Sequence, residues 1–457
     1  MNGMRLRSIV VAMLLLASVV EFSVRGPARL VQSFGWNDFL APYIQAKAWV
    51  QGKNPYSAQS LVSLWPADNQ RPPWVDAEAA NGTLEMKRGM PTPYPISSLV
   101  ILSPFTLLSW SVALRLWILV TVGAVVLSPF ALLSICGCSL FDLRSQLFLA
   151  AVFALAPLHT GLGTANPAML AVSLMVMTVW AARSGLGRTA GVLLAIAVCL
   201  KPTVAGGLLL YYLIRRQRKV AIIACGFATI ILIVGVSRLA LAGVPWLPSY
   251  FENTRRIFAA GSLADFTRPD PVRFNMINAQ VLFYGLLGSA SLANLLSRLL
   301  GAALLGWWLW LCFRRPVASE LLEISAVSIV SLIAVYHRSY DSALLVWVLA
   351  WSVLLVKKRS TTLITLVTIL PFLVPGPPLL SELVRAGRIP PTISSGWLWN
   401  NLVMPHEIWA LIFLAIFLLY SASEGVEERP LPVSPGPIVN AFRPPSAPCA
   451  TLPSSPH

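Results

Sequence analysis

Residues 36–56 read WNDFLAPYIQAKAWVQGKNPY, and they place the carboxyl group of Asp38 directly after the first long apolar stretch of the chain. From Asp38 to Gly52 the apolar residues recur at helical spacing, which predicts a short amphipathic helix lying on a membrane surface. Asn37 can cap the start of this helix, and Gly52 can end it. The positive end of the helix dipole would then favour a negative, proton-accepting group at Asp38. The pattern leaves open that Asp38 only caps the helix.

The composition is that of a multi-pass membrane protein. Of the 457 residues, 56% are hydrophobic and only 11% are charged, and the mean hydropathy is +0.72, values far from those of soluble domains. The net charge of +16 would suit nucleic acid. Many of the basic residues, however, lie in short turns between apolar spans, where they set orientation and contact anionic lipid. We therefore expect membrane lipids as partners and no nucleic acid.

The apolar stretches predict about 12 transmembrane helices in the cell membrane (inner or plasma membrane), with both termini in the cytoplasm. The stretch from Ile96 to Trp110 is interpreted as interfacial or re-entrant, because a full crossing would move the following arginine clusters to the outer side. The predicted division is a first transmembrane helix at 1–24, an extracytoplasmic loop with interfacial or re-entrant helices at 25–112, a polytopic domain at 113–421 and a disordered Pro/Ser-rich cytoplasmic tail at 422–457. The fold class is all-α.

Several polar residues gather at the outer ends of these spans. Ionisable groups are costly beside apolar spans, so their clustering predicts a polar cavity that faces outward. The residues are Asp38, Asn166, Lys201 and the run Tyr336-His337-Arg338-Ser339-Tyr340-Asp341. Simpler interpretations stay open: Lys201 snorkels to the interface, His337 and Arg338 form a hydrated turn, or Asp341 only pairs with Arg338.

No spacing of metal ligands, Walker loop or Gly-rich dinucleotide motif stands out, so we expect no cofactor. A carboxylate and several cations beside a lipid-facing cavity suit transfer of a group from a phosphate-linked lipid. The carboxylate would deprotonate an acceptor hydroxyl, and the cations would hold the departing phosphate. The same cavity would also suit a transporter or flippase that binds a lipid-linked sugar without chemistry, or a noncatalytic assembly protein.

Four short motifs together resemble glycosyltransferase family 87, whose members are multi-pass enzymes of the C superfamily that use polyprenyl-phosphate sugars. They include the mannosyltransferases of phosphatidylinositol mannoside synthesis. The likeness covers most of residues 1–356. The motifs are Asp38-Phe39 with Gly52 and Pro55-Tyr56, Tyr94-Pro95 with Leu99 and Pro104, Gly163-Thr164-Ala165-Asn166, and Leu200-Lys201-Pro202.

The resemblance implies an inverting sugar transfer on the outer membrane face, with Asp38 as the catalytic base and a polyprenyl-phosphate hexose, most simply mannose, as the donor. Departures from the family pattern at Pro42, Ile96 and Thr164 leave the sugar and the lipid or glycan acceptor open. Lys201 and Arg338 are predicted to hold the donor phosphate. The residues predicted to bind substrate are Asn166, His337, Tyr340, Asp341 and Tyr56.

Overall fold

The structure is a computed structural model that describes residues 2–32, 37–84, 90–215, 217–314, 319–374, 376–432, 434–435 and 438. Over these residues the regular secondary structure is helical, and the β-contacts are the isolated bridges Met276–Arg338 and Val356–Glu428. The predicted all-α class is thereby confirmed.

The helices follow one another with short connections. The first group is α1 (Asn2–Ser23), the π-helix η1 (Val24–Ala28), α2 (Arg29–Gln32), α3 (Leu40–Val50), α4 (Ala58–Ser63), α5 (Pro73–Ala80), α7 (Ile96–Leu102) and the 3-10 helix η2 (Ser103–Leu107). The second is α8 (Trp110–Cys136), α9 (Leu143–Phe153), α10 (Ala156–Gly163), α11 (Pro167–Arg183), α12 (Gly187–Leu200), α13 (Pro202–Ile214), α14 (Arg218–Leu241) and α15 (Trp246–Ile257). The third is η3 (Pro271–Asn275), α16 (Ala279–Leu287), α17 (Ala290–Arg314), α18 (Glu320–Ala334), η4 (Ser339–Leu344), α19 (Leu345–Leu349), η5 (Ala350–Leu355), α20 (Arg359–Ile369), η6 (Leu370–Phe372), α21 (Gly376–Arg385), α22 (Pro391–Ser394), η7 (Trp399–Val403) and α23 (His406–Glu424).

Five described helices are long and apolar enough to cross a membrane, and two bent helix pairs raise the number to seven. The five are Leu6–Ala28, Trp110–Cys136, Arg218–Leu241, Ala290–Arg314 and His406–Glu424. Further apolar helices are shorter, among them α11, α12 and α13. Several of them, such as α12 and α13, are shorter than the ~20 residues that one upright crossing needs. The chain is thus a multi-pass membrane protein, and the number of twelve spans stays a prediction.

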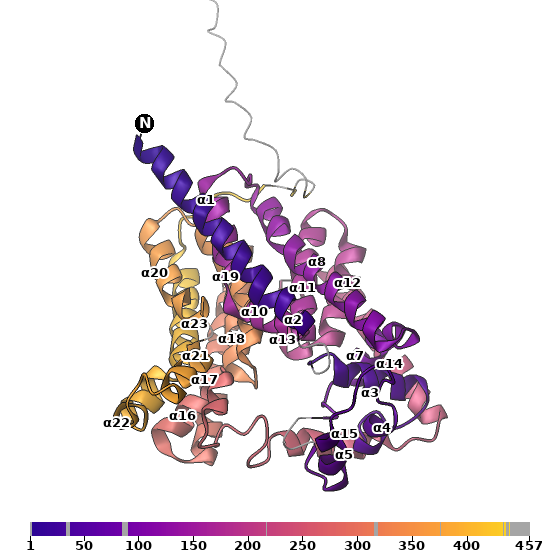
Figure 1. Cartoon of the computed structure of the whole chain (residues 1–457). Coiled ribbons are helices and arrows are strands. Elements are labelled where there is room, and N and C mark those ends of the chain that lie inside the picture. Colours follow the sequence, from indigo (N-terminus) through magenta and orange to yellow (C-terminus); the bar gives the residue numbers. More distant parts are fainter. Residues whose placement is uncertain are drawn as a thin grey trace, which may run out of the picture.

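The short helices of the large connections gather at one end of the bundle. Figure 1 shows α3, α4, α5 and α15 beneath one side of the long helices, and α16, α21 and α22 beneath the other, whereas the N-terminus lies at the opposite end. The segments around 37–84, 246–287 and 376–403 therefore share an end, which is where the predicted outer-facing cavity would have to lie.

The prediction of a surface helix after Asp38 was wrong. Helix α3 is buried almost all round, with Lys47 half-buried and Val50 exposed, and it packs against α7 and η2. Gln45 is the fully buried polar residue of α3, and its amide group donates hydrogen bonds to the carbonyls of Pro55 (3.1 Å) and Thr92 (2.8 Å). A helix whose polar groups are paired internally needs no solvent-facing side. The predicted turn at its end is confirmed by the positive φ of Gly52, 66°.

Candidate active site

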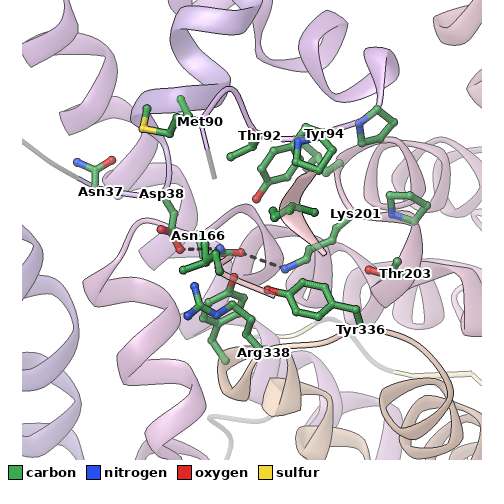
Figure 2. Close-up of a pocket in the computed structure, with 18 of the residues that line it drawn as sticks. Asn37, Asp38, Met90, Thr92, Tyr94, Asn166, Lys201, Thr203, Tyr336 and Arg338 are labelled. Atoms are coloured by element: carbon green, nitrogen blue, oxygen red, sulfur yellow. Dashed lines mark hydrogen bonds between the residues drawn. The ribbon is translucent and has the colours of Figure 1, made fainter. Parts of the chain in front are cut away.

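A cavity of about 310 Å³ opens among the polar residues at this end of the bundle. Figure 2 shows Asp38, Asn166, Lys201, Arg338, Tyr94 and Tyr336 converging on it from separate segments of the chain. Its volume lies at the lower end of the range for small-molecule sites, about 300–1,000 Å³. The other lining residues are Asn37, Ala41, Met90, Thr92, Pro93, Pro95, Leu200, Pro202, Thr203, Tyr250, Ile257, Leu263 and Tyr340.

Asp38 is fixed in the wall of this cavity from three directions. Its backbone N–H donates to the carbonyl of Thr164 at 2.8 Å, and its Oδ2 accepts from Nδ2 of Asn166 at 2.8 Å. The next residue, Phe39, is fully buried and stacks on Trp117, with ring centroids 4.5 Å apart and planes 3° from parallel. The N-cap position of α3 is Phe39, whose backbone N–H donates to Oδ1 of Asn37 at 3.1 Å, and the described hydrogen bonds of the Asp38 side chain include no bond to the start of that helix. The interpretation of Asp38 as a mere helix cap was therefore wrong.

The turn before α11 aims Asn166 at Asp38. The Oδ1 atom of Asn166 accepts from the backbone N–H of Ala168 at 2.9 Å, which is an N-cap bond, and this leaves the amide nitrogen to face Asp38. The preceding Ala165 has a φ of 56°, in the left-handed region that residues with a Cβ rarely occupy. Its carbonyl accepts from the indole nitrogen of Trp117 at 3.0 Å. Trp117 thus holds this turn and the ring beside Asp38 at once.

Lys201 occupies the break between α12 and α13, where Pro202 cannot continue the hydrogen bonding of α12. Its Nζ atom lies 2.6 Å from Oδ1 of Asp341, 3.4 Å from Oδ1 of Asn166 and 4.7 Å from the centroid of the Tyr340 ring. A lysine with these partners does not snorkel, so that interpretation was wrong. Its charge is largely compensated by Asp341.

Asp341 and His337 lie behind the cavity wall. Asp341 is 2% exposed, and its Oδ2 contacts Nδ1 of His337 at 2.9 Å and accepts from the backbone N–H of Arg338 at 3.2 Å. His337 is fully buried. Neither residue lines the cavity, although both were predicted to bind substrate. They fix the position of Lys201 and of the backbone at Arg338.

Arg338 is the uncompensated cation of the site. Over the residues that the structure describes, its guanidinium has neither an ion pair nor a hydrogen bond, so the simpler interpretation in which Asp341 only pairs with Arg338 was wrong. Burial opposes its charge, but Tyr336, Tyr340 and the negative charges of Asp38 and Asp341 together raise the pKa of Arg338. Arg338 is therefore a stable cation with free donors that face the cavity.

Tyr94 was missed as a lining residue, although the Tyr94-Pro95 motif pointed to its segment. Burial, with the charges of Asp38 and Asp341, raises the pKa of Tyr94 well above its ordinary value, so its hydroxyl stays neutral. Tyr56, which was predicted to bind substrate, lies behind it: its hydroxyl donates to the Tyr94 carbonyl at 2.8 Å, and it lines no part of the cavity. Tyr56 thus supports Tyr94.

A second cavity, of about 190 Å³, adjoins the first at Asp38. The two cavities share Asp38, Arg338 and Tyr340. The remaining residues of the second cavity are Ala156, Pro157, Thr160, Thr164, Asn275, Ser339, Pro378 and Glu407. The carboxyl group of Asp38 and the guanidinium of Arg338 therefore line both cavities, so that each group could contact a ligand in either one.

No group of three or more His, Cys, Asp or Glu residues that could hold a metal ion occurs in the described part of the chain. The groups at the junction are a carboxyl, a guanidinium, phenols and an amide. Such a set can bind an anion and move a proton.

The fold and the site define a multi-pass membrane protein with a cavity that cationic, acidic, phenolic and apolar side chains line. The profile of glycosyltransferase family 87 matches residues 92–336, which is more than half of the chain. The chain belongs to this family, and it is accordingly a membrane glycosyltransferase that uses a sugar donor and an acceptor. Neither a curated protein nor a solved structure matches the chain.

The match covers Tyr94, Asn166, Lys201 and Tyr336, whereas Asp38 and the residues from 337 onward lie outside it. The matched segment is narrower than the resemblance over residues 1–356. The roles of Asp38 and Arg338 therefore have to be argued from geometry.

Proposed function

We propose that the protein transfers a hexose, most simply mannose, from a polyprenyl phosphate to a hydroxyl of a lipid or glycan acceptor. The reaction takes place at the outer face of the cell membrane, with both termini of the protein in the cytoplasm. The observation that carries the proposal is the position of Asp38 and Arg338 together at the junction of the two cavities. A base and an uncompensated cation can there act on the same reacting atoms.

The larger cavity suits the donor. Its walls include apolar side chains from several segments, among them Met90, Leu200 and Ile257, and both Lys201 and Arg338 face it. An apolar wall with cations matches a lipid phosphate. Because Lys201 already pairs with Asp341, the guanidinium of Arg338 is the main phosphate ligand, and Lys201 adds a weaker positive potential from its own position in the wall.

Asp38 acts as the base. As the acceptor hydroxyl oxygen forms its bond to the anomeric carbon, its proton passes to the Asp38 carboxylate. The bond from the anomeric carbon to the phosphate oxygen breaks, and the phosphate leaves with the electron pair beside Arg338. Attack opposite the leaving group inverts the anomeric configuration. Because the phosphate departs as an anion, no second carboxylic acid has to protonate it, in contrast to glycoside hydrolysis.

The neighbours of these groups position the reaction. Asn166 donates to Asp38 and holds its free oxygen toward the cavity. Tyr94 and Tyr340 supply hydroxyl and ring surfaces against the sugar. His337, Asp341 and Tyr56 act from behind the wall as positioning residues.

The test is the Asp38→Asn variant of the full chain, reconstituted in lipid vesicles with radiolabelled polyprenyl-phosphate mannose and a membrane lipid extract as acceptor. Loss of a general base should lower the rate of transfer by roughly 10²–10⁴-fold, with the donor still bound. The matched control is Asp76→Asn, the same change at an exposed residue of α5 that lines neither cavity and should transfer at the wild-type rate.

Product analysis separates transfer from transport. A new glycosidic bond of inverted configuration is expected, whereas label that only changes leaflet would show a flippase. Near-normal turnover by Asp38→Asn would remove Asp38 from the mechanism.

A further inference from the structure

The second cavity differs in chemistry from the first. Lys201 does not line it, and Arg338 is the one cation among the described residues that do. It is lined instead by hydroxyl, amide and carboxyl side chains from four separate segments: α10 with its following turn, the end of η3, the start of η4 and the start of α23. These groups can hold a ring with many hydroxyls, which both donates and accepts hydrogen bonds.

Glu407 is the distinctive residue of this cavity. It belongs to the first turn of α23 and is 4% exposed. Its Oε2 atom is buried with no hydrogen-bond partner among the described residues, while its Oε1 atom lies against the start of α21 at Gly376. A buried carboxyl oxygen without a partner is costly, and a ligand that supplies the missing bond recovers that cost.

Two further side chains of the wall are unengaged. Asn275 and Ser339 line the cavity, and neither side chain hydrogen-bonds to any part of the chain that the structure describes. The hydroxyl of Thr164 donates to the carbonyl of Thr160 at 3.0 Å, so its lone pairs remain available to a ligand donor. Donors and acceptors thus face the same small space.

The position relative to Asp38 indicates which ligand enters. Given the proposed function, on which this step rests, the phosphate lies in the larger cavity, and an inverting displacement brings the acceptor to the opposite side of the anomeric carbon. The second cavity shares Asp38 with the first, so a hydroxyl bound in it lies beside the proposed base. The larger cavity has both Lys201 and Arg338 in its wall, whereas Lys201 does not line the second, so the larger cavity suits the phosphate better and the second suits a neutral group.

We propose that the second cavity is the acceptor subsite and binds a neutral, hydroxyl-rich ring, with Glu407 accepting from its hydroxyls and Asn275 and Ser339 completing the contacts. Glu407 and Ser339 lie outside the segment that matches the family profile, residues 92–336, whereas Asn275 lies inside it. The acceptor preference therefore depends in part on α23, at the C-terminal end of the folded chain.

The experiment measures ligand-induced thermal stabilisation of the purified full chain by tryptophan fluorescence. The probes are the methyl α-glycosides of mannose, glucose and galactose, and myo-inositol, with sorbitol as the non-specific solute and mannose 6-phosphate as the anionic comparison. A ligand that binds only the folded state raises its unfolding temperature. The variants are Glu407→Gln, which keeps the shape and one acceptor oxygen, and Asn275→Ala. The matched control is Glu382→Gln at an exposed residue of α21.

At least one neutral probe should stabilise the wild type and Glu382→Gln beyond sorbitol. Its affinity should fall roughly 2- to 10-fold in Glu407→Gln, the size of effect that one lost neutral hydrogen bond carries, and by a similar factor in Asn275→Ala. Equal stabilisation of wild type and both lining variants, no stabilisation beyond sorbitol, or stabilisation by mannose 6-phosphate alone would overturn the proposal. If Glu407→Gln fails to fold, Asn275→Ala carries the same comparison.

Failure of this subsite and failure of the proposed function give different results. The Asp38→Asn variant should lose transfer but keep the stabilisation by the neutral probe. If Glu407→Gln is stabilised by the probe as strongly as the wild type, but Asp38→Asn still loses transfer, the subsite alone is rejected. A Glu407-dependent stabilisation in a protein whose Asp38→Asn variant transfers sugar normally would reject the base and keep the binding site.

Discussion

The buried pair of Lys201 and Asp341 predicts a strong thermodynamic coupling. Their side chains are 15% and 3% exposed, and the Nζ to Oδ1 distance is 2.6 Å. Removing one member of such a pair leaves the other charge uncompensated, which costs about 3–5 kcal/mol. Replacing both removes the buried charges together and costs much less. Lys201→Met and Asp341→Asn should therefore each destabilise the protein, whereas the double variant should recover most of the loss.

The size of the effect on the unfolding temperature follows from the length of the chain. With an unfolding entropy of about 2.1 cal/mol/K per residue over 457 residues, a loss of 3–5 kcal/mol lowers Tm by roughly 3–5 °C. The double variant should lie within about 1 °C of wild type. Fluorescence-detected unfolding of all four proteins in one detergent measures this cycle. A double variant that shows the sum of the two single losses would refute the pairing.

Three further predictions concern the groups around Asp38. Arg338→Gln should lower kcat/KM for the donor by roughly 100-fold. Arg338→Lys should lower it by less, because lysine keeps the charge but lacks the planar guanidinium. Steady-state kinetics with labelled donor measures both variants. Equal loss in the two variants would show that charge alone is not what Arg338 supplies. Phe39→Leu should lower Tm by about 1 °C, because it removes an aromatic stack worth about 1 kcal/mol. It should also lower kcat more than it raises KM, because the neighbouring Asp38 shifts. An unchanged kcat would separate that stack from the position of Asp38. Ala165→Gly should raise Tm by about 1 °C and leave turnover unchanged. At the φ of 56° alanine carries a steric cost of about 1 kcal/mol, and glycine does not. A lower Tm in this variant would contradict the reasoning.

Part of this site could be predicted from the sequence because polar residues at the ends of apolar spans are costly and therefore conspicuous. Asp38, Asn166, Lys201, Arg338 and Tyr340 were all predicted on that ground, and the structure brings them to one cavity. The pairing of Lys201 with Asp341 was not predicted, because a sequence cannot show that Lys201 reaches a carboxyl group 140 positions away from its helix break.

Other features gave no signal in the sequence. Glu407 follows a proline and a histidine at the start of an apolar helix, where a carboxyl group commonly serves as a helix-terminal charge. Its contact with the second cavity depends on how α23 packs near η4 and α10, which no local pattern encodes. The surface helix after Asp38 was predicted wrongly for a related reason: apolar spacing indicates which face is buried, but not that other segments also cover the opposite face.

The site combines residues from inside and outside the segment that matches the family profile, and Trp117 contacts both groups. Its indole donates to the turn that presents Asn166, inside the segment typical of the family, and its ring stacks on Phe39, which lies outside it. The proposed base, Asp38, is therefore positioned by a contact between the family segment and the N-terminal loop, while Glu407 comes from the C-terminal helix. Since Asp38 and Glu407 are held by separate elements, substitutions in α23 can change which acceptor binds without moving the base. Acceptor preference should accordingly diverge among related chains with less constraint than the position of Asp38.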